Sequence, residues 1–109
     1  MCKFDLTGSI TKAYPSSDGK LVKLTIKPEL PEGFGPRKDD EKVAQLDIWA
    51  DAKLATGLAL MARVRMTGYF YLGSRKALTK EGRAFFPKDL RMKATELVDL
   101  ATAEVRKTG

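Results

Sequence analysis

The amino-acid sequence predicts an all-β domain in which five strands close into a small barrel, with one short helix between the third and fourth strands. In five segments apolar and polar residues alternate, which is the pattern of half-buried strands. A glycine falls within the first and the fourth segments, at Gly8 and Gly68, as expected for strongly bent strands. The length of 109 residues favours a single domain with a single core.

The first three strands are predicted at residues 3–11, 22–27 and 43–50. The run from Tyr14 to Gly19 is dense in turn-forming residues, so the first two strands form a hairpin. Residues 28–42 hold three prolines and two glycines and are predicted to be a long loop. The inward positions of the third strand are even-numbered, which turns Trp49 outward.

The chain then turns through a short helix into the last two strands. Asp51 is placed to cap a helix at 52–55, which Gly57 ends. The fourth and fifth strands are predicted at 63–72 and 90–95. Residues 73–88 join them as a long basic connection, which we expect to be mobile at its tip.

Beyond the fifth strand, the spacing of apolar residues predicts a short C-terminal helix. These residues are Leu97, Leu100, Ala101 and Val105. We therefore divide the chain into a barrel domain at 1–98 and a short basic extension at 99–109 that is helical in part. Five strands with a helix between the third and fourth are the layout of an OB-fold, a small barrel that often binds oligonucleotides.

The charge of the chain is positive and unevenly distributed. Lysine and arginine number 20 against 14 aspartate and glutamate residues, a net charge of +6. Residues 1–62 carry nine basic and nine acidic side chains, whereas residues 63–109 carry eleven basic and five acidic ones. The excess therefore lies in the second part of the chain, and it favours a polyanionic partner.

The composition argues against several classes of protein. The chain has no histidine and a single cysteine, Cys2, so neither a zinc site nor a disulfide framework is expected. The usual general base of hydrolases is missing too, so we expect no enzyme, no metal and no cofactor. No apolar run approaches the roughly 20 residues that span a bilayer, and the first residues do not resemble a signal peptide. We expect a soluble, cytoplasmic protein without a membrane partner.

Three short motifs lie along the predicted strands. Leu6-Thr7-Gly8-Ser9-Ile10 opens the first strand, Ile48-Trp49-Ala50-Asp51-Ala52-Lys53-Leu54-Ala55 leads into the helix, and Val64-Arg65-Met66-Thr67-Gly68 lies in the fourth strand. The basic connection with Lys80-Glu81-Gly82-Arg83 follows them. In this order they resemble the bacterial and phage single-stranded DNA-binding proteins, over residues 4–98.

This resemblance implies an OB-fold that binds single-stranded DNA with little sequence preference, as a homodimer or homotetramer, in DNA replication, recombination or repair. Trp49 matches a family aromatic residue that stacks on a base. Val43 and Arg75 stand where the family often has aromatic residues. The family recruits replication and recombination proteins through an acidic C-terminal tip, whereas the last residues here are basic. A short chain without an acidic tail favours a phage or mobile-element protein.

Single-strand binding without sequence preference needs cations along the phosphates and exposed rings on which bases stack. Both kinds of side chain occupy the predicted outward positions and the basic connection. The candidate DNA-binding residues are Lys23, Lys27, Trp49, Arg63, Arg65, Tyr69, Tyr71, Arg75, Lys76, Lys80, Arg83, Phe85, Phe86, Arg91 and Lys93.

Other interpretations of the same residues stay open. The aromatic residues are also compatible with cross-strand pairs in an ordinary sheet or with a subunit interface, although the mixture of arginine and tyrosine favours binding. The basic face also suits a primosomal-type OB-fold that docks a partner protein and binds nucleic acid weakly. An RNA-binding OB-fold is a third alternative, because phosphate contact and base stacking serve DNA and RNA alike.

Overall fold

The strands and the short helix lie close to where the alternation of the sequence places them. The computed structural model describes residues 2–35 and 42–107. The barrel strands are Lys3–Pro15 (β1), Leu21–Pro28 (β2), Leu46–Asp51 (β3), Arg63–Ser74 (β4) and Lys88–Asp99 (β7). The helix α1 (Ala52–Ala55) lies between β3 and β4 as predicted, whereas β3 begins three residues later than expected. Among the described residues, no helix is long and apolar enough to cross a membrane.

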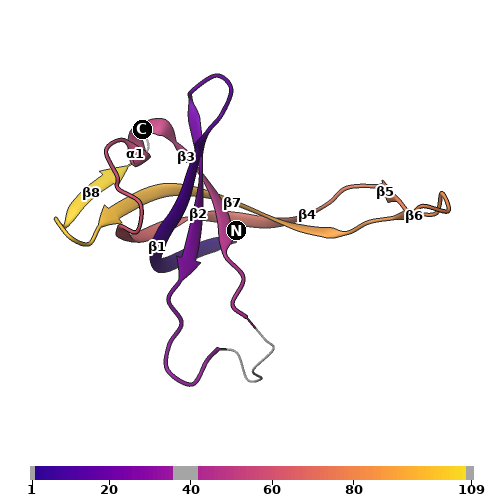
Figure 1. Ribbon diagram of the computed structural model, residues 1–109, viewed down its shortest axis with the longest axis horizontal. Coiled ribbons are helices and arrows are strands. Elements are labelled where there is room, and N and C mark those ends of the chain that lie inside the picture. Colours follow the sequence, from indigo (N-terminus) through magenta and orange to yellow (C-terminus); the bar gives the residue numbers. More distant parts are fainter. Residues whose placement is uncertain (1, 36–41, 108–109) are drawn as a thin grey trace.

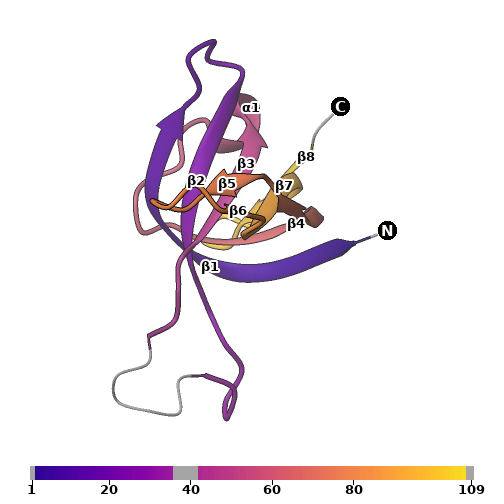
Figure 2. The same cartoon turned by 90° about the vertical axis from the view of Figure 1, so that its right-hand side faces the viewer.

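β1 pairs with two neighbours, and this double pairing closes one side of the barrel. Its first half pairs antiparallel with β4 and its second half pairs antiparallel with β2. On the opposite side, β3 meets β7 in a parallel contact at Trp49 and Lys93, which completes the closure. The crossing of β1, β2 and β3 over β4 and β7 is visible in Figure 1, and Figure 2 shows the curve of β1. The result is a closed, mixed five-stranded barrel, consistent with an OB-fold.

Side chains from all five strands and from α1 fill the barrel interior. The buried apolar residues are Ile10, Leu24, Ile26, Ile48, Ala50, Leu54, Val64, Met66, Met92, Ala94 and Leu97. Leu54 is the contribution of α1, so the helix packs against the barrel. No charged or polar residue is buried among those that the structure describes. The outward positions of the strands therefore carry the charged side chains.

Two glycines stand where the backbone of a neighbouring strand comes very close. Gly8 faces the carbonyl of Lys27 on β2, and Gly68 faces the backbone of Lys93 and Ala94 on β7. A Cβ atom on Gly68 would lie 2.8 Å from the Cα atom of Ala94, closer than atoms can pack. The predicted need for glycine within the first and fourth strands is explained by these contacts.

β4 and β7 continue beyond the barrel as a two-stranded ribbon. Their pairing extends to Ser74 opposite Lys88, and the tip adds the short paired strands Ala77–Leu78 (β5) and Ala84–Phe85 (β6). Figure 1 shows this ribbon projecting to the right, away from the other strands. We call residues 72–90 the arm. The predicted connection at 73–88 is therefore a hairpin with paired strands at its base and near its tip.

The prediction of a C-terminal helix is wrong, because the apolar residues that suggested it belong to two strands and to the turn between them. β7 runs on to Asp99, and after a turn β8 (Glu104–Lys107) pairs back on it antiparallel. Leu97 is buried as a strand residue opposite Met66 of β4, and Val105 lies in β8 opposite Val98. Sheet pairing thus outweighs the weak helical spacing of this segment.

Arg106 of β8 connects this last hairpin to α1. Its guanidinium donates hydrogen bonds to the carbonyl oxygens of Leu54 and Thr56, at 3.0 and 2.6 Å. Glu104 accepts a further bond from the Arg106 Nε at 3.1 Å. Because the last carbonyls of a helix lack partners within the helix, the arginine stabilises the C-terminal end of α1.

We predict that Gly68→Ala destabilises the barrel, because its methyl group must displace the backbone of β7. Overpacking of a rigid site costs about 1 to 3 kcal/mol, and urea unfolding followed by circular dichroism measures the loss. Gly73→Ala is the matched control on the same strand, since the atom nearest to its added Cβ lies 3.5 Å away. Equal stability of the two variants would contradict the close approach at Gly68.

Candidate nucleic-acid interface

Lysines and aromatic residues alternate around the outside of the barrel at positions that are direct neighbours across the strands. In order around the barrel these residues are Tyr14, Lys23, Trp49, Lys93, Tyr69 and Lys3. We call this set the outer row. Residues next to it along the strands, such as Leu24, Ile48 and Ala94, are buried, so the row faces outward. The row begins and ends on β1, because the strands of a closed barrel are staggered.

A groove of about 520 Å³ opens where β3 and the residues of β4 and β7 next to the arm meet the turn between β1 and β2. Its lining residues are Ser16, Leu21, Trp49, Tyr69, Phe70, Tyr71, Arg91, Met92 and Lys93. We call it the aromatic groove. In the β4–β7 ladder, Arg91 is directly opposite Tyr71 and Lys93 is directly opposite Tyr69. Each cation of the groove therefore stands beside an aromatic ring, and no carboxylate belongs to the lining.

A smaller hollow of about 220 Å³ adjoins the aromatic groove, and Trp49 and Arg91 line both. The charges of this hollow are balanced, since two cations, Lys23 and Arg91, and two carboxylates, Asp47 and Asp89, line it. The hydroxyl of Thr25 donates a hydrogen bond to Asp47 at 2.8 Å. The hollow is therefore less suited to phosphate than the aromatic groove is.

Arg63 and Arg65 lie farther along β4, and carboxylates bind both of them. Arg65 donates hydrogen bonds of 2.9 and 2.6 Å to Asp5, and Arg63 donates bonds of 2.6 and 2.8 Å to Glu29. These bonds lower the pKa of each carboxyl below its ordinary value. Six positions separate Arg63 from Tyr69, about 20 Å along a strand. The two arginines therefore do not join the tyrosines of the same strand.

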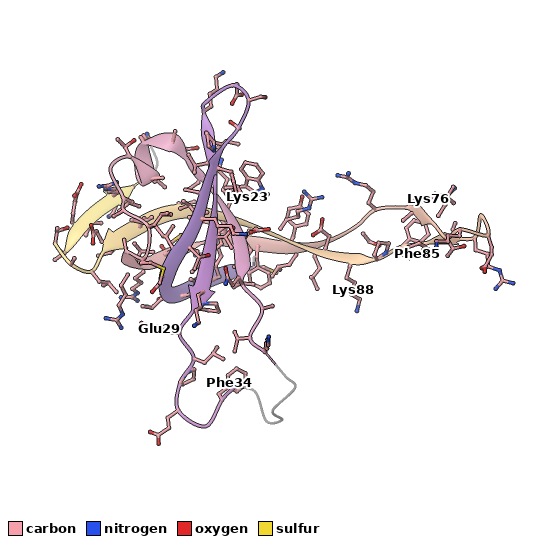
Figure 3. The ribbon with its side chains drawn as sticks, viewed as in Figure 1. Lys23, Glu29, Phe34, Lys76, Phe85 and Lys88 are labelled. Atoms are coloured by element: carbon pink, nitrogen blue, oxygen red, sulfur yellow. The ribbon has the colours of Figure 1, made fainter. Side chains whose placement is uncertain are left out.

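Most of the remaining candidate residues lie on the arm. Figure 3 shows Lys76 and Phe85 toward its tip and Lys88 nearer the barrel. The exposed side chains are those of Arg75, Lys76, Lys80, Arg83, Phe85, Phe86 and Lys88. None of these cations forms an ion pair with another residue that the structure describes. Lys27 lies opposite Ser9, at the other end of β2 from the aromatic groove.

Tyr14 and Lys3 belong to the outer row but are missing from the sequence-based candidates. The sequence predicts Tyr14 in a turn, whereas β1 extends through Pro15. A bulge after Ile10 also reverses which side chains of β1 face outward, so simple alternation would have turned Tyr14 inward. The Nζ of Lys23 lies 5.7 Å from the centre of the Tyr14 ring, within range of a cation–π interaction.

Comparison with known proteins does not assign the chain to a family. No protein-family model matches the chain, and no curated protein is significantly similar to it. Within residues 2–35 and 42–107, no three histidine, cysteine, aspartate or glutamate side chains gather where a metal ion could be held. The aromatic groove, the outer row and the basic arm are therefore the features from which a function is argued.

Proposed function

We propose that this protein binds single-stranded DNA without sequence preference and acts in DNA replication, recombination or repair. The observation that carries the proposal is the aromatic groove, in which Trp49, Tyr69 and Tyr71 stand beside Arg91 and Lys93. Every base has a flat face that stacks on an aromatic ring, and cations beside the rings are placed for the phosphates. Stacking does not depend on the identity of the base, so such a site is tolerant of sequence.

The shape of the groove favours single strands over duplexes. Ser16 and Leu21, beside the β1–β2 turn, form one wall, and the residues of β4 and β7 next to the arm form another. An unpaired base can enter between these walls and reach Trp49, whereas the bases of a duplex are stacked on one another. A duplex can therefore bind only through its phosphates, without the stacking contribution.

The arm adds exposed positive charge to that of the barrel lysines. The arginines at positions 63, 65 and 91 of the barrel strands are each bound to a carboxylate, while the arm cations form no ion pair among the described residues. Exposed and uncompensated cations attract a polyanion over about a Debye length. We infer that the arm draws the strand toward the barrel, where the groove holds its bases.

A protein-docking role for the arm is a second candidate, and one observation favours it. Leu72 and Leu90 are directly opposite each other at the base of the arm, and their side chains are 61% and 40% exposed. Because alternate residues of a strand face opposite ways, this apolar pair lies on the other face from Tyr71 and Arg91. Exposed apolar pairs of this kind often mark contacts with a partner protein.

We predict that single-stranded oligo-dT quenches the fluorescence of Trp49, the only tryptophan of the chain, because a base stacks on its indole. A duplex of the same length should bind more weakly and leave the emission nearly unchanged. A parallel titration with oligo-rU measures the preference between DNA and RNA. Unchanged emission at saturating oligo-dT, with binding established by anisotropy of a labelled strand, would remove Trp49 from the site.

Stacking and phosphate contact should separate in a salt series. Replacing Trp49 or Tyr71 by alanine is expected to weaken binding by about 1 to 3 kcal/mol with little change in the salt slope. Replacing Arg91 or Lys93 by alanine should reduce the slope by up to about 0.7 for each lost phosphate contact. Arg63→Ala is the matched control, since its guanidinium is bound to Glu29 away from the groove. A slope change for Arg63→Ala equal to that for Arg91→Ala would speak against the groove as the binding site.

Shortening the arm separates the two candidate functions. Joining Ser74 to Lys88 through Asn-Gly removes Arg75, Lys76, Lys80 and Arg83 but keeps the Leu72–Leu90 pair. We expect a nearly unchanged melting temperature, because the removed residues lie outside the core, and much weaker binding of oligo-dT. A folded, shortened protein that binds oligo-dT as tightly as the parent would shift support to the docking role.

A further inference from the structure

Each of the two cations in the aromatic groove already has a carboxylate partner in the free protein. The Nη2 of Arg91 lies 2.9 Å from the Oδ2 of Asp89, and the Nζ of Lys93 lies 3.8 Å from the Oδ1 of Asp51. Neither carboxylate lines the groove itself, because Asp89 lines the smaller hollow and Asp51 stands at the start of α1. The carboxylates therefore approach the cations from outside the space that a base would occupy.

The surroundings of Asp51 show that its carboxylate is not used by the helix. Asp51 is the N-cap residue of α1, where an aspartate usually accepts a hydrogen bond from the first turn, yet its side chain makes no such bond. The N–H of Ala52, the first residue of the helix, donates to the carbonyl oxygen of Lys20 at 2.9 Å. The Asp51 side chain is also only 26% exposed, against 45% to 57% for the other carboxylates in ion pairs. It is thus held beside Lys93 without a role in capping.

We propose that Asp51 and Asp89 compete with phosphate groups for the cations of the aromatic groove and so limit the affinity of the site. Nucleic acid then binds by exchange, in which a phosphate oxygen replaces the carboxylate on Lys93 or Arg91 and the carboxylate returns to water. The inference rests on the proposed single-strand binding and adds a control of affinity within the same site.

This exchange increases the share of the binding energy that comes from base stacking, relative to phosphate contact. A cation that stays near a carboxylate neutralises a phosphate less completely, so fewer of the salt cations condensed on the nucleic acid are released. The carboxylate left nearby also repels the phosphate. A polyanion that cannot stack therefore gains little from the groove, whereas a single strand gains the contacts with Trp49, Tyr69 and Tyr71. Asp51 and Asp89 thereby act as specificity-determining residues.

The test compares the parent with Asp51→Asn and Asp89→Asn by anisotropy of a fluorescein-labelled oligo-dT over a series of NaCl concentrations. Each variant should bind about two- to fivefold more tightly at low salt, the range that an exposed ion pair supports. The salt slope should also steepen for each freed cation, by less than the about 0.7 that one full phosphate contact contributes. The side chain of Asp51 makes no capping bond to α1 and Asp89 lies outside the helix, so both variants should stay folded.

Glu29→Gln is the matched control, because it makes the same change of net charge and frees Arg63 away from the groove. Its affinity and slope should equal those of the parent. If Glu29→Gln raised the affinity for oligo-dT as much as the two aspartate variants do, the change of net charge alone would explain the effect, and the proposal would be overturned. Unchanged or weaker binding by both folded aspartate variants would overturn it too. If the parent binds neither oligo-dT nor oligo-rU at any salt concentration, the proposed function fails and this inference fails with it.

Discussion

The parallel contact between β3 and β7, at Trp49 and Lys93, is the interaction on which the site depends. It joins β3, at one end of the sheet, to β7, so that residues of β2, β3, β7 and β4 become neighbours on one outer surface. Without it, Trp49 would lie at an open edge, distant from the tyrosines of β4. The close approach at Gly68 contributes to the same closure. Because Gly68 has no side chain, the backbone of β7 can lie directly against β4 at this point.

The distribution of ion pairs divides the molecule into two electrostatic parts. On the barrel, arginines are matched by carboxylates, through Asp5, Glu29 and Asp89. Exposed pairs of this kind add little to stability, but they reduce the positive potential of the surface that carries them. On the arm, the cations have no such partners among the described residues, so the net positive charge of the chain is concentrated there. The groove lies at the junction of the two parts, where stacking surface and positive charge meet.

Much of the fold was predictable because strand alternation is a strong local signal. The five barrel strands, the short helix after Asp51, and the glycines at 8 and 68 all follow from residues that lie close together in the sequence. The C-terminal segment was predicted wrongly, because apolar residues at 97, 100, 101 and 105 fit a helix almost as well as two short strands. Pairing of β8 with β7 decides between them, and such pairing has no signature in the segment itself.

For the site, the sequence by itself determined which residue types face outward along a strand, such as Trp49 on β3 and Tyr71 on β4. The tertiary structure decided which of these outward residues meet. It brought Trp49 beside Lys93, turned Tyr14 outward through a bulge, and bound Arg63 and Arg65 to carboxylates 34 and 60 residues away. The physical reason is that the side of the strand to which a side chain points is set by the two-residue period of the local backbone. Which residues become its neighbours depends on strand register and barrel closure, which pair residues far apart in the chain.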